Sequence, residues 1–261
     1  MRYKEIEKNK EINAYLTKGN ANLGQLGFTD HSQAHCVQVA RQAGKILKRF
    51  GYSGHEIELA KIAGYMHDIG NAINRTHHAE YGALLANELL KDTDMVLEDR
   101  ITVVSAIGNH DESTGSPVDV ISAALIIADK TDVRRSRVRQ KERSAFDIHD
   151  RVNYAVTDSK LKIAEDKSVI ALNLQIDENI CSMYDYFEIF LERMMFCRKS
   201  VEILGTTFKL TANGRIFCQQ SLNLQVDIFR ECPCIVVGDF YQKIKIFIFP
   251  GRAASFPVLG G

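Results

Sequence analysis

The chain has 261 residues, 45% of them hydrophobic, and its 33 lysines and arginines are balanced by 33 aspartates and glutamates. This length suits one large domain or two small ones, and the composition is that of a folded rather than a disordered protein. Zero net charge provides no global attraction to nucleic acid or to an anionic membrane. No run of 18 apolar residues is present, the first residues are too charged for a secretory signal, and the six cysteines are irregularly spaced. We therefore expect a cytoplasmic protein that contacts neither membranes nor nucleic acid.

Apolar residues recur at helical spacing through most of the first 155 residues. The spacing predicts helices over residues 32–49, 54–67, 79–91, 95–109 and 117–139. We expect Asp94 to cap the fourth of these helices and Pro117 to begin the fifth, because these residue types are favoured at those positions.

Beyond residue 155 the pattern is mixed. Residues 160–165 and 168–176 predict two strands joined by a turn at Asp166 and Lys167, and residues 183–204 predict a helix. Asn213–Gly214 predicts a β-hairpin within residues 207–217. The last forty residues are expected to form a strand pair or a poorly ordered tail. We therefore predict a mainly α protein, with a helical domain over residues 1–155 and a smaller α+β appendage over residues 156–261.

Seven of the eight histidines lie before residue 111, in the segments HSQAH (31–35), MHDIG (66–70), THHAEYG (76–82) and NHDE (109–112) or at His55. Asp129 follows the apolar stretch ISAALIIA. Imidazole and carboxylate groups together suit Zn, Mn, Fe or Co. Charged residues next to apolar helical stretches are rarely buried without a partner, and a metal would serve all of them. Outside these clusters, His55 and His149 are expected to be ordinary surface or capping residues.

The order of these segments resembles the HD-domain superfamily of metal-dependent phosphohydrolases, over roughly residues 20–140. The resemblance rests on HxxxVA (35–40), MHDIG (66–70), HxxxGA (78–83), IxxH (107–110) and ADK (128–130). It implies an HD-type helical bundle that binds divalent metals, two in members with six ligands. The implied ligands are His35, His67, Asp68, His78, His110 and Asp129, with Asp68 bridging the two ions. Among the members, the chain is most similar to bacterial hydrolases of diadenosine polyphosphates. It lacks the GYP motif of the cyclic di-GMP branch, and Asn71 stands where many relatives have lysine.

The resemblance also implies a reaction, the hydrolysis of a nucleotide or another small phosphoester or phosphoanhydride by a metal-activated water. His31 does not keep the family spacing and is expected to contact substrate or a metal ligand. Seven basic residues lie between positions 130 and 143. Those nearest Asp129 are predicted to hold the substrate phosphate, because guanidinium and ammonium groups pair with phosphate oxygens: Lys130 and Arg134, with Arg135 behind them. The distant Arg139 and Arg143 are expected to be solvated.

Two other functions compete with this interpretation. The helical domain could be a non-catalytic sensor of a nucleotide or metal, with residues 156–261 binding a partner protein, although a pure sensor has no need of six ligands. An oxygen-activating di-iron enzyme could use the same ligand types. A nucleic-acid surface is disfavoured by the zero net charge and by the lack of aromatic residues in the basic run. Assembly into a homo-oligomer is compatible with all of these interpretations.

Overall fold

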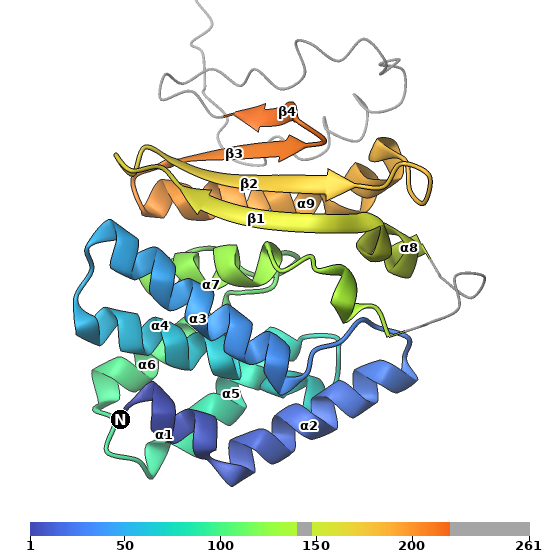
Figure 1. Cartoon of the computed structure of the whole chain (residues 1–261). Helices are drawn as coiled ribbons and strands as arrows, with labels where there is room; N and C mark the ends of the chain where they lie inside the picture. The colour runs from blue at the N-terminus through green and yellow to red at the C-terminus, as the bar shows by residue number, and fades with distance from the viewer. Residues whose placement is uncertain (140–147, 220–261) are drawn as a thin grey trace, which may run out of the picture. The chain divides into compact units, whose positions relative to one another are not determined.

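A bundle of helices and a four-stranded sheet make up residues 1–139 and 148–219, which are the residues that the computed structural model describes (Figure 1). Residues 148 and 149 are described by their backbone alone. The helices are α1 (Tyr3–Lys8), α2 (Lys10–Gln25), α3 (Gln33–Phe50), α4 (Gly54–Met66), α5 (His78–Lys91), α6 (Leu97–Gly108), α7 (Val120–Lys130), α8 (Ile148–Ala155) and α9 (Met183–Ile203), with short 3-10 turns η1 (Ile69–Ala72) and η2 (Arg135–Arg137).

Local capping interactions set the helix ends. Helix α4 begins at a capping box in which the Ser53 hydroxyl accepts from the backbone N–H of Glu56. Helix α3 ends at Gly51, whose φ of 90° requires a residue without a Cβ. The five helices predicted within residues 32–139 are all present as α3 to α7, so the helical part of the prediction is confirmed.

Three predicted helix boundaries are wrong. Val96 precedes α6, whereas Asp94 forms an ion pair of 2.8 Å with the N-terminal amine. Helix α7 begins after Asp119, whose side chain accepts from the backbone N–H of Ser122, so Pro117 lies outside it. The same helix ends at Lys130 rather than continuing to residue 139, because the basic segment that follows hydrogen-bonds to the loop before α3 and contains only the short 3-10 turn η2.

The sheet contains β1 (Val156–Ile163), β2 (Val169–Ile176), β3 (Thr207–Ala212) and β4 (Arg215–Gln219), in that order. β1 and β2 are antiparallel, as are β3 and β4, whereas β2 and β3 are parallel and joined through α9. Both predicted turns are present: Lys167 has a φ of 63°, and Asn213 and Gly214 have φ values of 49° and 77°. Consecutive positive φ values at Asn–Gly are those of a type I′ hairpin turn.

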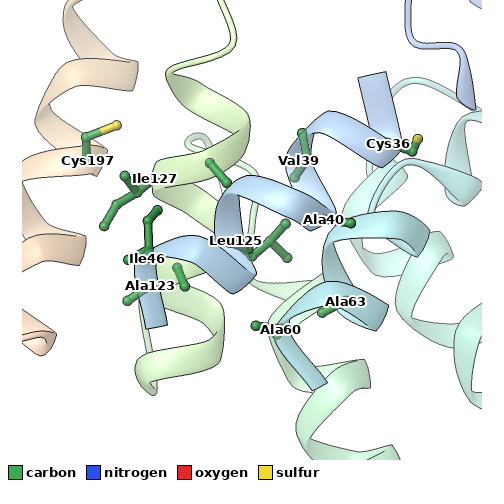
Figure 2. Close-up of a cluster of buried hydrophobic side chains, with 14 of the residues drawn as sticks. Cys36, Val39, Ala40, Ile46, Ala60, Ala63, Ala123, Leu125, Ile127 and Cys197 are labelled. Carbon is green, nitrogen blue, oxygen red and sulfur yellow. The ribbon is translucent and has the colours of Figure 1, made fainter. Parts of the chain in front are cut away.

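One hydrophobic core runs through the helices and the sheet. Figure 2 shows the part of it that lies between α3, α4, α7 and α9. Helix α9 packs against α7 on one side and against β3 on the other (Figure 1). The core therefore continues from the helical bundle into the C-terminal part. It includes Val39, Ala40 and Ile46 of α3, Ala60 and Ala63 of α4, Leu125 and Ile127 of α7, Cys197 of α9 and Phe208 of β3.

The mainly α fold with a smaller α+β part is thus as predicted from the sequence. The division into two domains at residue 155 remains a prediction. Helices α7 and α9, which lie on either side of residue 155 in the sequence, contribute to the same hydrophobic core. The predicted strand pair or tail in the last forty residues falls wholly outside the described part of the chain. No described helix has an apolar stretch long enough to cross a membrane.

Candidate metal centre

The six side chains that the sequence analysis selected as metal ligands converge on one buried region of the helical bundle. Each of them lies at or near the end of a helix, where the backbone leaves the bundle axis. All the histidines and Asp68 are buried, and the Asp129 side chain is 13% exposed. They are His35 at the start of α3, His67 and Asp68 after α4, His78 at the start of α5, His110 after α6 and Asp129 in the last turn of α7.

Two glycines make this convergence sterically feasible. A Cβ added at Gly64 would lie 2.8 Å from the Cα of Ala40, so α4 and α3 touch backbone to backbone near His67 and His35. A Cβ added at Gly70 would lie 1.9 Å from the carbonyl oxygen of His78. The glycine that ends the MHDIG segment therefore allows η1 to approach the first turn of α5.

One group of ligand atoms lies between α3, α4 and α7. The Nε2 atoms of His35 and His67 lie 3.3 and 3.6 Å from Oδ1 of Asp129. Oδ2 of Asp68 faces the same two nitrogen atoms, at 3.7 and 3.2 Å. One ligand atom from each of His35, His67 and Asp129 lies within 4.8 Å of the other two, which is close enough for a single metal ion to contact all three.

A second group is formed by Asp68, His78 and His110, again with its ligand atoms within 4.8 Å of one another. Nε2 of His78 lies 3.9 Å from Oδ1 of Asp68 and 3.2 Å from Nε2 of His110. The two oxygens of Asp68 therefore face different groups, Oδ2 the first and Oδ1 the second. This is the placement that a bridging carboxylate requires.

Hydrogen bonds at Nδ1 fix the tautomers of the four histidines. In each ring Nδ1 lies within hydrogen-bond distance of an oxygen that can only accept, so Nδ1 carries a proton and donates it. The acceptors are Asp132 Oδ2 for His35 at 2.7 Å, the Gly64 carbonyl for His67 at 2.9 Å, the Arg75 carbonyl for His78 at 3.2 Å and the Ile107 carbonyl for His110 at 2.6 Å. Each Nε2 is then free to be a ligand, an arrangement typical of metal-binding histidines.

The unsatisfied atoms of the region fit a metal cation. Nε2 of His35, Nε2 of His67 and Oδ2 of Asp68 are buried without a hydrogen-bond partner among the described residues. Buried polar atoms in native proteins are nearly always satisfied, and three such atoms facing one another could be satisfied together by one bound cation. The donor set of nitrogen and carboxylate oxygen suits Zn, Mn, Fe or Co.

The electrostatics of the protein groups in this region also favour a cation. Burial alone would lower the pKa of His67, but the carboxylates of Asp68 and Asp129 outweigh it and raise the pKa to about 10. These carboxylates therefore stabilise a positive charge beside them, which either a proton or a metal ion can supply. Burial lowers the pKa of His78 to about 4, and burial together with the neighbouring histidines lowers that of His110 to about 3, so both rings are neutral near pH 7.

Cys36 lies near the first group and also has its sulfur within 4.8 Å of ligand atoms of His67 and Asp68. Burial raises the pKa of this thiol well above its ordinary value. Because the thiolate rather than the thiol binds metals, Cys36 is a poorer ligand than the histidines and carboxylates around it.

Lys130 is buried and paired with two carboxylates. Its Nζ lies 2.9 Å from Oδ2 of Asp129 and 2.6 Å from Oε2 of Glu112. The contact to Asp129 uses the carboxylate oxygen opposite the one that faces His35 and His67. Contact between Lys130 and a substrate phosphate, which we predict from the sequence, stays a prediction.

The other two predicted phosphate contacts, Arg134 and Arg135, interact with other side chains. Arg134 Nη2 donates to Oδ2 of Asp132 at 2.9 Å, and the Arg135 guanidinium lies 4.4 Å from the centre of the Tyr154 ring. Arg134 does not lie on the helix predicted over residues 117–139, because α7 ends at Lys130. Substrate contact by either arginine remains a prediction.

His31 lies beside His35, with ring centres 5.6 Å apart, and its Nδ1 donates to the Thr29 carbonyl at 2.7 Å. That position is next to the candidate ligands, while its contact with substrate is still a prediction. Arg139 is exposed, as expected for a solvated residue, and its Nε also donates to the Phe28 carbonyl at 2.9 Å. Arg143 lies outside the described residues.

Three side chains that contact a candidate ligand or Lys130 have no role predicted from the sequence. Asp132 accepts the Nδ1 proton of His35, Glu112 pairs with Lys130, and the Asn71 amide donates to Oδ1 of Asp68 at 2.8 Å. A sequence signal exists for each in its closeness to a ligand, three positions from Asp129, two from His110 and three from Asp68. His55 pairs with Asp99 at the surface, as expected for a histidine outside the clusters.

Comparison with known proteins agrees with this geometry. Residues 33–151 match the family model of the HD domain. A protein of Methanocaldococcus jannaschii, "Uncharacterized protein MJ1020", is 27% identical over 192 residues, which are 65% of this chain and 74% of that protein.

The other similar proteins include ribonucleases Y. That of Enterococcus faecalis is 31% identical over 126 residues, and that of Campylobacter jejuni subsp. doylei is 33% identical over 132 residues. These matches cover 46% and 49% of this chain, but the chain spans only 22% of either relative. Residues 33–151, the segment that matches the HD domain, contain all six candidate ligands.

Proposed function

We propose that the chain is a metal-dependent phosphohydrolase that cleaves a small phosphoester or phosphoanhydride, such as a nucleotide. The observation that carries the proposal is the convergence of four histidine Nε2 atoms and two aspartates in one buried region, with every Nδ1 held by an acceptor. A sensor of nucleotides would not need buried ligand atoms that are left without hydrogen bonds.

The chain's own residues would perform distinct tasks. Bound divalent ions lower the pKa of a coordinated water and polarise the phosphoryl group. Asp68 lies between the two ligand groups and would help to set the distance between them. The Asn71 amide would fix the rotation of the Asp68 carboxylate. We propose that two ions are bound, because the two groups of three ligands share no residue.

We propose positioning roles for the cations near the ligands. Lys130 orients Asp129 and limits the negative charge of the site, since its ammonium touches the oxygen that faces away from the histidines. Arg134 reaches His35 through Asp132. Either side chain would have to leave a carboxylate partner before it could contact a substrate phosphate.

A second candidate is cleavage of the phosphodiester bonds of RNA. It is favoured by the likeness of the metal-ligand segment to ribonucleases Y. Both candidates require the same metal chemistry, and they differ in the size of the substrate.

The test is a screen for hydrolysis with the full chain, after metal removal by a chelator and after addition of Mn²⁺. Nucleoside polyphosphates and a short single-stranded RNA serve as substrates. We expect Mn²⁺-dependent turnover of a nucleotide, loss of turnover in Asp129→Asn and normal turnover in the surface control Asp158→Asn. Cleavage of the RNA alone would favour the second candidate, and no Mn²⁺-dependent turnover of any substrate would contradict both.

A further inference from the structure

A row of alternating charges connects α9 to the candidate metal centre. Arg193 Nε donates to Oε1 of Glu112 at 3.0 Å, and Oε2 of Glu112 lies 2.6 Å from Nζ of Lys130. The same Nζ lies 2.9 Å from Oδ2 of Asp129. A residue of the C-terminal part is therefore three ionic contacts away from the ligand atoms.

Burial makes these contacts stronger than ordinary surface ion pairs. The exposed fraction of the side chain is 33% at Arg193, 18% at Glu112 and 8% at Lys130. Charges that are largely shielded from water are weakly screened, and removing one partner leaves the other poorly compensated. The Arg193 guanidinium also lies 4.9 Å from the centre of the buried Phe190 ring, which restricts its position.

Glu112 ties this row of charges to a second ligand. It lies two residues after His110, in the segment that leaves α6. The intervening Asp111 has Oδ2 at 3.3 Å from Nδ1 of His78. Holding Glu112 in place therefore also holds the segment that presents His110 toward His78.

We propose that Arg193 is a positioning residue of the metal centre. It fixes Glu112, and through Glu112 it fixes Lys130 against Asp129 and the segment that carries His110. Helix α9 lies outside the segment matched by the HD domain model, residues 33–151, so the C-terminal part contributes to the site a contact that the family segment does not contain. The inference rests on the proposed metal site and does not depend on which substrate is hydrolysed.

The test is a double-mutant cycle in the full chain, read out as Mn²⁺ affinity by calorimetric titration. We expect Arg193→Gln to weaken Mn²⁺ binding by at most about tenfold, the lower end of the cost of losing a ligand's direct partner, because Arg193 acts through Glu112 and Lys130 and the ligands must then be ordered during binding. Arg193→Lys should restore most of the affinity, since it keeps the charge. Lys199→Ala, at an exposed position of the same helix, is the control and should bind as the unaltered chain does.

The double variant of Arg193 and Glu112 distinguishes a positioning role from a general loss of stability. If Arg193 acts through Glu112, the double variant Glu112→Gln with Arg193→Gln should bind Mn²⁺ no more weakly than Glu112→Gln alone. Unchanged affinity in Arg193→Gln, or losses that multiply in the double variant, would overturn the proposal. Mn²⁺ binding without hydrolysis of any substrate would contradict the proposed function. The Mn²⁺ affinities of the double-mutant cycle would still test the role of Arg193.

Discussion

The Nε2 atoms of His78 and His110 lie 3.2 Å apart, and each ring has its Nδ1 beside a backbone carbonyl oxygen. Both Nε2 atoms therefore present lone pairs to each other, which is repulsive unless a cation lies between them. Two nitrogens bound to one ion at about 2.1 Å in tetrahedral positions are about 3.4 Å apart. The observed separation thus fits two ligands of the same metal ion.

Replacing His110 by Ala should release one ion and leave the other. The group of His35, His67 and Asp129 keeps its ligand atoms in this variant, whereas the second group loses one of its three. Metal content measured by mass spectrometry should fall from about two ions per chain to about one. An unchanged metal content would show that His110 is not a ligand.

Replacing Asp132 by Asn should weaken metal binding by about 10–100-fold, the usual cost of losing the carboxylate partner of a ligating histidine. The buried Asp132 side chain fixes the tautomer of His35 through a bond of 2.7 Å. Arg134→Ala should have a smaller effect on affinity, since Arg134 only supports Asp132. The measurement is Mn²⁺ titration of both variants. Normal metal affinity in Arg134→Ala with a raised KM would instead support direct contact with the substrate.

The metal-free protein should lose stability as the pH rises from 6.5 to 10. Burial opposes a charge on His67, but Asp68 and Asp129 raise its folded-state pKa from 6.5 to about 10. The proton on His67 therefore stabilises the folded state fully below pH 6.5, and this contribution is lost as the pH approaches 10. Thermal unfolding of chelated protein at pH 6.5 and 8 should show a lower Tm at pH 8. An equal drop in Tm for His67→Gln would exclude His67 as the cause.

Gly64→Ala should destabilise the fold by about 1–3 kcal/mol, the usual cost of overpacking a core. The added Cβ would lie 2.8 Å from the Ala40 Cα, and neither backbone can move without separating α3 from α4. Gly54→Ala is the matched control in the same helix, because its Cβ meets no described atom within 4 Å. Urea unfolding measures both, and equal stabilities would contradict the close packing of the two helices.

Local signals in the sequence were sufficient to predict much of the fold. Helical spacing of apolar residues predicts α3 to α7 and α9, and Asn213–Gly214 predicts the turn between β3 and β4. The end of α7 could not be predicted, because it depends on hydrogen bonds between segments that are distant in the sequence. The backbone N–H of Asp30 donates to the Arg137 carbonyl at 2.7 Å, and such a contact between distant segments has no local sequence pattern.

The candidate ligands could be selected from the sequence because they stand in short segments with a known order. Their partners could not. Asp132 belongs to a basic run that suggests a solvated helix, and its bond to His35 joins positions 97 residues apart. Arg193 lies in the C-terminal part, and only the packing of α9 against α7 brings it to Glu112.

The metal content of the full chain, purified without oxygen and compared with that of Asp68→Ala, tests the central claim most directly. Asp68 presents one oxygen to each group of ligands, so its loss should affect both. We predict about two divalent ions per unaltered chain and loss of most of this metal in Asp68→Ala. An unaltered chain that binds no divalent metal, or an Asp68→Ala variant that keeps its full complement, would contradict the account.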